Sequence, residues 1–108
     1  MIRKVIILDV AKPDFREIKS YVRHQFGETV WNKVNQEFKT AISNIGLNPE
    51  AGKVIEELND LGEGNFRVRL VRQTRIVYEY NAQQVLVHMF VHTKRDFRTH
   101  LMKRIVSQ

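Results

Sequence analysis

The sequence has 108 residues, of which 43% are hydrophobic, and it carries a formal net charge of +6 with no cysteine. This length suits a single domain spanning residues 1–108, and the hydrophobic fraction suits a folded core. No apolar run is long enough for a transmembrane helix and no secretory signal is present, so we expect a cytoplasmic protein that does not enter the membrane. The lack of cysteine excludes disulfides and thiolate-bound zinc.

The positive charge is concentrated in the C-terminal two-fifths of the chain. Residues 1–65 hold nine Lys and Arg against ten Asp and Glu, whereas residues 66–108 hold nine against two, a net charge of +7. A one-sided positive field attracts polyanions or an acidic protein. A solvated basic surface with no dedicated partner would give the same composition.

The N-terminal half predicts one strand followed by a helix. The apolar run within residues 3–8 is typical of a strand covered on both faces. Pro13 suits the first turn of a helix, and Gly27 is a natural helix end. Between them, apolar side chains recur at helical spacing at Phe15, Ile18, Tyr21, Val22 and Phe26.

A second helix is predicted directly after the first. Its apolar stripe ends at Gly46 and consists of Val30, Trp31, Val34, Phe38, Ala41, Ile42 and Ile45. Only residues 27–29 separate the two helices, so we expect them to fold back as an antiparallel hairpin.

Three strands are predicted in the C-terminal half, at residues 66–71, 74–80 and 84–91. Apolar residues alternate along each run, and the connections are short enough for hairpins. The third run is apolar on both faces, with Val85, Val87, Met89 and Val91 on one face and Leu86, His88 and Phe90 on the other. We therefore expect the third strand in the interior of the sheet.

A final helix is predicted with Asp96 as its N-cap, because Phe97, Leu101 and Ile105 recur every four residues. The order of elements is then an N-terminal strand, an antiparallel helix hairpin, a three-stranded antiparallel meander and a C-terminal helix. This order predicts an α+β fold with two layers.

The sequence contains no motif for a metal or a cofactor. The four histidines, His24, His88, His92 and His100, do not stand at a ligand spacing with a nearby carboxylate. A Gly-rich phosphate loop, a nucleophile elbow and a pair of catalytic carboxylates are also missing. We therefore expect neither a metal nor a cofactor.

One catalytic interpretation has a physical basis, namely metal-independent cleavage of RNA. That reaction needs a base, an acid and cations that stabilise the developing negative charge. Arg75, Lys94 and Arg95 supply cations, and His92 or His100 could transfer protons. Because arginine and histidine are also common near strand ends for structural reasons, the pattern does not decide between these roles.

A binding interpretation rests on the arginines of the predicted strands. Arg67, Arg69 and Arg75 alternate with apolar residues, which predicts that all three lie on the polar face of the sheet. Such a face suits a phosphate backbone or an acidic segment of a partner protein. Few aromatic side chains are interleaved with the arginines to stack bases, and both partners remain open.

The order and spacing of these elements resemble the RelE/ParE superfamily of toxins from bacterial toxin–antitoxin modules. The helix-hairpin stretch is similar to ParE-type proteins at Asp14-Phe15, Ile18, Tyr21 and Phe26-Gly27. The segments "NPEAGK", "TRIVYEY" and "VHTKRDFRTHLMKRI" resemble the turn after the second helix, the central strand and the C-terminal end of the family. The resemblance covers almost the whole chain and implies the fold predicted above.

The superfamily implies two activities. RelE-like members cleave mRNA in the ribosomal A site with basic residues and usually a C-terminal Tyr or His, whereas ParE-like members inhibit DNA gyrase. This sequence keeps Arg75 and Arg95 of the RelE pattern but offers His100-Leu101 where RelE proteins carry a tyrosine. The resemblance therefore favours a ParE-like gyrase inhibitor with no catalytic residues. The alternative is a metal-independent endoribonuclease that uses Arg75, Arg95, His92 and His100.

The resemblance also implies partners. A cognate antitoxin would neutralise the toxin in a hetero-oligomer by wrapping a disordered acidic segment around it. The target would be DNA gyrase, or the ribosome and its mRNA in the alternative. The residues expected to contact a partner are Arg67, Arg69, Arg75, Lys94, Arg95 and Arg98. A non-toxic homologue that binds another protein is a further alternative.

Overall fold

The computed structural model describes residues 2–55, 65–93 and 103. The two helices are α1 (Lys12–Phe26) and α2 (Glu28–Leu47), and the five strands are β1 (Lys4–Ile7), β2 (Lys53–Val54), β3 (Asn65–Val71), β4 (Thr74–Tyr80) and β5 (Gln84–His92). Two 3₁₀ turns, η1 (Asp9–Ala11) and η2 (Pro49–Ala51), connect β1 to α1 and α2 to β2. The predicted helix with Phe97, Leu101 and Ile105 lies outside the described residues.

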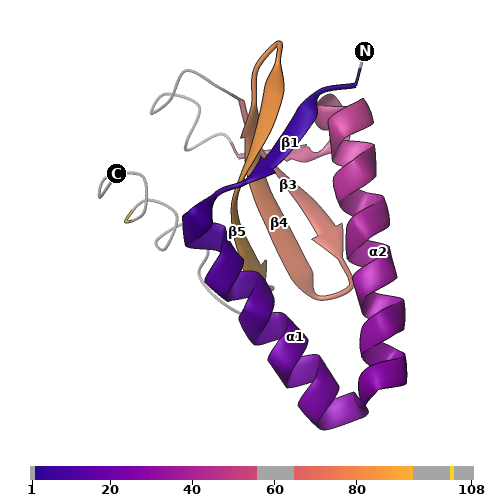
Figure 1. Ribbon diagram of the computed structural model, residues 1–108. Helices are drawn as coiled ribbons and strands as arrows, with labels where there is room; N and C mark the ends of the chain where they lie inside the picture. The colour runs from indigo at the N-terminus through magenta and orange to yellow at the C-terminus, as the bar shows by residue number, and fades with distance from the viewer. Residues whose placement is uncertain (1, 56–64, 94–102, 104–108) are drawn as a thin grey trace.

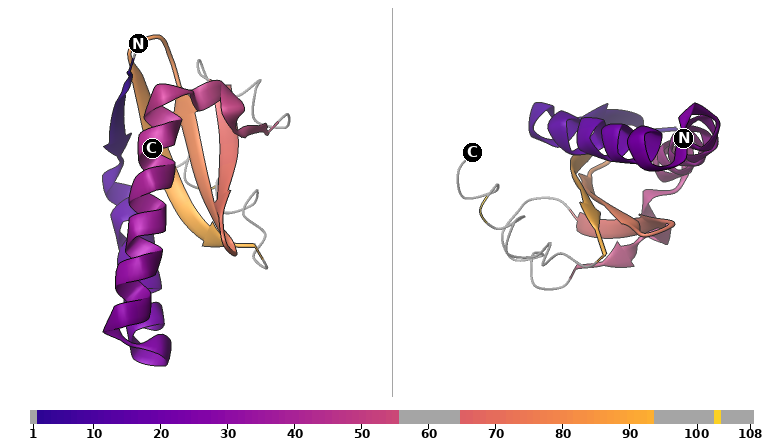
Figure 2. Two further views of the ribbon diagram at one scale, coloured as in Figure 1. Left: turned by 90° about the vertical axis from the view of Figure 1, so that its right-hand side faces the viewer. Right: turned by 90° about the horizontal axis from the view of Figure 1, so that it is seen from below.

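The described strands form one sheet in the order β1-β5-β4-β3-β2, and both helices cover the same face of it (Figures 1 and 2). Strands β2 to β5 pair antiparallel, whereas β1 pairs parallel with β5. The α+β class, the helix hairpin and the antiparallel meander are thus confirmed. Strand β5 lies inside the sheet as predicted. Strand β1, however, is an edge strand whose apolar side chains are only half-buried.

The core between the helices and the sheet is built on the predicted stripe of α2. Trp31, Val34, Phe38, Ala41 and Ile45 are all buried there. Aromatic contacts bind the layers together, because the Phe15 ring of α1 lies 5.7 Å from Trp31, 5.4 Å from Phe38 and 5.2 Å from Phe90 of β5. These edge-on and tilted contacts hold α1, α2 and β5 together as one layered core.

The far end of the hairpin differs from the prediction. Tyr21 and Phe26 belong to the predicted apolar stripe of α1, yet they are 62% and 61% exposed. The hairpin extends past the ends of the strands, as Figure 1 shows, so the last turns of α1 have no sheet to pack against. The two rings instead contact each other, with their centroids 6.4 Å apart.

The predicted alternation along β5 is wrong beyond Val87. Val85, Val87 and Phe90 face the helices, whereas Met89 and Val91 pack on the opposite face of the sheet. The register shifts from Tyr78↔Val87 to Val77↔Met89, so His88 is an extra residue with no partner position in β4. A bulge of one residue moves every later side chain to the other face.

Candidate partner-binding groove

The three arginines of β3 and β4 do not share a face, contrary to the prediction. Residues directly opposite each other in an antiparallel pair lie on the same face, and Arg69 pairs with Ile76 while Arg75 pairs with Leu70. Ile76 belongs to the core beneath the helices, so Arg67 and Arg69 lie on the helix-covered face and Arg75 lies on the other. The reason is the two-residue turn between the strands, which places odd-numbered residues of β3 opposite even-numbered residues of β4.

Arg67 holds the loop before β3 in place. Its Nη1 donates hydrogen bonds to the backbone oxygens of Glu50 at 2.8 Å and Gly52 at 2.9 Å. Its guanidinium carbon lies 5.7 Å from the centre of the Tyr80 ring, and that of Arg3 lies 5.5 Å from the same ring. Arg67 therefore has a structural role whether or not a partner also contacts it.

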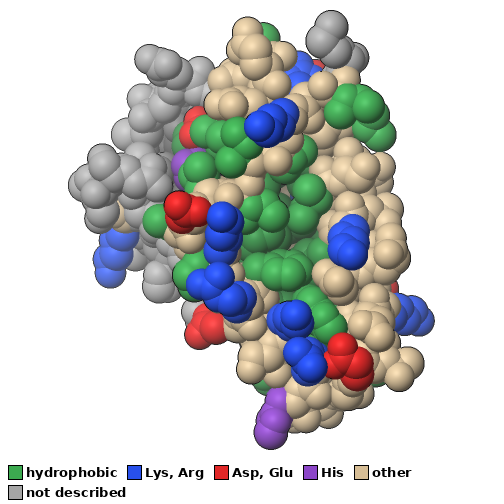
Figure 3. All heavy atoms as spheres, viewed as in Figure 1, with side chains coloured by type: hydrophobic (Ala, Val, Ile, Leu, Met, Phe, Trp, Pro, Cys, Tyr) green, Lys and Arg blue, Asp and Glu red, His purple; other side chains and the backbone are tan. Residues whose placement is uncertain are grey.

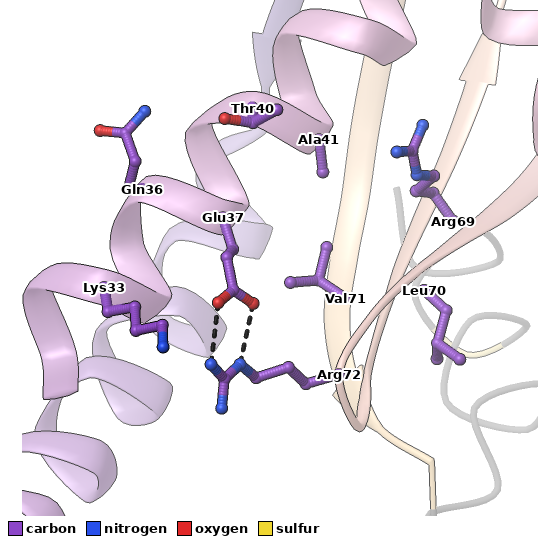
Figure 4. Close-up of a pocket in the computed structure, with 9 residues that line it drawn as sticks. All are labelled: Lys33, Gln36, Glu37, Thr40, Ala41, Arg69, Leu70, Val71 and Arg72. Atoms are coloured by element: carbon purple, nitrogen blue, oxygen red, sulfur yellow. Dashed lines mark hydrogen bonds and ion pairs between the residues drawn. The ribbon is translucent and has the colours of Figure 1, made fainter.

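Arg69 lies two residues further along the strand and lines a groove between α2 and β3 (Figure 4). The groove has a volume of about 600 Å³ and is lined by Lys33, Gln36, Glu37, Thr40, Ala41, Arg69, Leu70, Val71 and Arg72. The lining includes the apolar side chains of Ala41 and Val71 and the basic side chains of Lys33, Arg69 and Arg72. Figure 3 shows a different face, on which apolar side chains between α1 and α2 are surrounded by Lys and Arg side chains. The groove thus combines an apolar floor with a mainly basic rim.

An ion pair crosses the groove from the β3–β4 turn to α2. Nε and Nη2 of Arg72 each donate a hydrogen bond of 2.8 Å to one carboxylate oxygen of Glu37 (Figure 4). The hydrogen bond from Arg72 holds the pKa of the Glu37 carboxyl below its usual range, and the charges of Arg72 and Lys33 act in the same direction. Glu37 therefore remains ionised at neutral pH. Its negative charge balances that of Arg72 and leaves the positive charges of Lys33 and Arg69 on the rim.

Among the described residues, the strand edge beside the groove has no neighbouring strand beyond β2. Strand β2 has only two residues, which pair with Arg67 and Val68, and the Ile55 N–H donates to the Phe66 carbonyl at 3.1 Å. No strand of the described ranges pairs with the outer edge of β3 at Arg69–Val71. Residues 69–72 also line the groove, so this edge of β3 lies beside it.

The structure does not bring Arg75 and His92 together on one face. Val91 packs on the sheet face opposite the helices and Phe90 on the helix face, so alternation places His92 with Phe90, away from Arg75. Arg75 Nη1 donates to the Thr93 carbonyl at 2.9 Å, and His92 Nε2 lies 3.1 Å from the Gln73 side-chain oxygen. The other candidate residues, Lys94, Arg95, Arg98 and His100, lie outside the described residues.

Two features of the site escaped the sequence analysis. The wall of the groove on α2 includes Lys33, Glu37 and Thr40, whose spacing of four and three residues marks one flank of a helix, although the sequence does not say what that flank faces. The second feature is a buried contact on the other sheet face, where His88 Nε2 lies 2.7 Å from a Glu79 oxygen. The bulge that places His88 there has no signal in the sequence.

Among residues 2–55, 65–93 and 103, no group of three or more His, Asp or Glu side chains is arranged to hold a metal ion. Neither α1 nor α2 combines the length and the apolar character that a membrane span requires.

The fold defines a small α+β domain in which a helix hairpin packs on an antiparallel meander. The chain matches the family model described as the ParE toxin of type II toxin-antitoxin system, parDE, over residues 5–97. This match spans most of the sequence, so the protein belongs to the ParE toxin family and is a toxin of a type II toxin–antitoxin system. The family implies a cognate antitoxin as partner. No curated protein sequence matched the chain.

Proposed function

We propose that this toxin acts by inhibiting DNA gyrase in the cytoplasm and that a cognate antitoxin neutralises it. The observation that carries the proposal is the match to the ParE toxin family over residues 5–97. A gyrase inhibitor of this kind acts by binding its target in a fixed ratio and needs no catalytic residues or cofactor of its own.

The placement of Arg75 and His92 also favours this function over RNA cleavage. A ribonuclease must hold a proton-transferring group and a cation against the same phosphate. Arg75 and His92 lie on opposite faces of the sheet, and each of them has a hydrogen-bond partner within the protein. This pair is therefore poorly placed to act together on one RNA phosphate.

The basic groove supports the proposed neutralisation by an antitoxin. Antitoxin segments fold on their toxins and bury apolar side chains while their acids pair with basic residues. The apolar floor formed by Ala41 and Val71, with Lys33 and Arg69 on the rim, offers both kinds of contact. We expect the neutralised complex to be a toxin–antitoxin hetero-oligomer.

The direct test combines the purified protein with gyrase, ATP and relaxed plasmid DNA. We expect loss of supercoiling and the appearance of linear DNA only when gyrase and the toxin are both present. A translating extract treated with the toxin should show no new cuts in ribosomal A sites. Unaffected gyrase, together with A-site cuts that disappear in Arg75→Ala, would establish the ribonuclease instead.

A further inference from the structure

We propose that the open edge of β3 at Arg69–Val71 binds an extended acidic segment of the antitoxin as an added β-strand. This inference rests on the proposed neutralisation by an antitoxin. It adds the conformation of the bound segment, the backbone groups that hold it and the chemistry of its side chains.

The hydrogen-bond pattern of β3 makes Leu70 the anchor. A two-residue turn connects Val71 to Thr74, so these residues form a hydrogen-bonded pair, and Arg69 and Ile76 form the next one. The N–H and C=O of Leu70 therefore point away from β4. The same alternation makes the Phe66 carbonyl point outward, and there it accepts the Ile55 N–H. The N–H and C=O of Leu70 point outward in the same way, at a position that β2 does not reach.

The groove supplies side-chain contacts for such a strand. Successive side chains of an added strand point to opposite faces of the sheet, so every second one enters the groove between β3 and α2. There it meets the apolar floor at Ala41 and Val71 and the cations of Lys33 and Arg69. No ion pair joins either cation to a carboxylate in the described residues. A segment that alternates apolar and acidic residues fits this arrangement.

The backbone geometry favours a strand over a helix as the occupant. A bound helix satisfies its own backbone groups and would cover the Leu70 N–H and C=O without pairing them, which costs free energy. An added strand pairs both groups. The apolar Leu70 side chain, 57% exposed, lies on the opposite face and gains cover from the neighbouring side chains of the added strand.

The charge on the edge argues for an acidic partner rather than a second copy of this chain. Edge-to-edge pairing of two copies would bring together two strands with arginines at positions 67, 69 and 72. Like charges facing each other across strands are destabilising, and charged residues on edge strands generally prevent self-pairing. An acidic segment converts the same charges into attraction.

The experiment uses the full-length protein labelled with ¹⁵N and a short synthetic peptide in which valine and glutamate alternate. We expect the peptide to bind and the amide hydrogen exchange of Leu70 to become slow on binding. The amides of Arg69 and Val71 already bond to β4 and should change little. The expected affinity falls with added salt, because the glutamates pair with Lys33 and Arg69.

Two variants at one position separate backbone from side chain. Leu70→Pro removes the outward N–H without removing a hydrogen bond to β4, whereas Leu70→Thr keeps the N–H and changes only the side chain. We expect Leu70→Pro to bind the peptide at least about tenfold more weakly and Leu70→Thr to bind within about twofold of the wild type. Urea unfolding checks that both variants are folded. A peptide with methylated backbone nitrogens gives the same test on the unchanged protein and should not bind.

Three results would overturn the inference: no binding of the peptide, binding without slower exchange at Leu70, or equal binding by Leu70→Pro. Protection of Leu70 that rises with protein concentration in the absence of peptide would assign the edge to a second copy instead. The gyrase assay separates this inference from the proposed function. If the wild-type toxin traps linear DNA but the peptide experiment fails, only the strand addition is removed and the proposed function stands.

Discussion

Strand β3 has two halves with different surroundings. In the closed half, Asn65–Val68, β2 pairs along the outer edge, the Arg67 guanidinium bonds to two backbone oxygens, and Phe66 is buried. In the open half, Arg69–Val71, no described strand follows the outer edge, and Arg69 lines the groove beside α2. Two arginines on the same strand and the same face thus have different roles.

The difference arises in the loop that precedes β2 and not in β3 itself. Gly52 lies so close to Tyr78 that a Cβ at this position would clash with the Tyr78 hydroxyl oxygen, so glycine allows the loop to lie over the sheet. The Tyr78 O–H donates to the Pro49 carbonyl at 2.6 Å, and Arg67 donates to the Glu50 and Gly52 carbonyls of the same loop. The loop therefore closes the first half of β3 and leaves the second half available.

The largest expected effect is a difference in unfolding free energy between substitutions of two apolar residues on the same face of β3. Phe66→Ala removes a ring that is 2% exposed and should lower the free energy of unfolding by about 3–5 kcal/mol. Leu70→Ala changes a mostly exposed side chain and should stay within about 0.5 kcal/mol of the wild type. Urea unfolding of both variants measures this difference, and similar losses for the two would contradict the division of the strand.

A second substitution tests how the loop is held. Gly52→Ala should cost about 1–3 kcal/mol, because the added methyl group must displace the Tyr78 hydroxyl or the loop. The same change in a Tyr78→Phe background should cost less, since the oxygen that it would meet is gone. A double-mutant cycle measured by urea unfolding gives the coupling. Additive costs would show that Tyr78 does not limit the approach of the loop.

The contact of Tyr78 in the closed half should also make the free energy of unfolding fall at alkaline pH. Burial raises the pKa of the Tyr78 phenol above its ordinary value of 10.0. The folded state therefore keeps this proton after the unfolded state has lost it, so the contribution to stability is complete below pH 10.0 and declines as the pH rises towards the folded-state pKa. Unfolding midpoints measured against pH should show this decline in the wild type, and Tyr78→Phe should show a smaller one.

The smallest expected effect concerns the open half. Glu37→Gln removes the only acid that lines the described groove and releases Arg72 from its ion pair. The alternating valine–glutamate peptide should then bind a few-fold more tightly, about the size of a surface charge interaction. Gln36→Glu, which adds an acid to the same wall, should weaken binding by a similar factor. Affinities unchanged in both variants would show that the groove does not contact the peptide.

The sequence was sufficient for most of the fold, because the elements carry clear periodicity. The apolar stripe of α2 from Trp31 to Ile45 matched the structure. Apolar residues also alternate along β3 and β4, but the apolar row of β3 lies on the sheet face opposite that of β4. Strand β2 was missed since Lys53 and Val54 are too few residues to show a period. The bulge at His88 was missed because β5 is apolar on both faces, so its amino-acid pattern does not reveal an extra residue.

The site was less predictable than the fold for a physical reason. The sequence identifies Arg69 as a basic strand residue, but its role depends on where β2 ends and which flank of α2 lies opposite. The shared face predicted for Arg67, Arg69 and Arg75 failed because a two-residue turn fixes the register between β3 and β4. Partner contacts of Lys94, Arg95 and Arg98 remain predictions.

The division of β3 can be measured most directly by amide hydrogen exchange on the free protein. The N–H groups of Val68 and Leu70 both point away from β4, and only that of Val68 has β2 beside it. We predict slow exchange at Val68, close to that of the core strands, and much faster exchange at Leu70. Equal protection at the two amides would mean that the second half of β3 is already covered, and it would contradict both the open edge and the strand addition proposed for it.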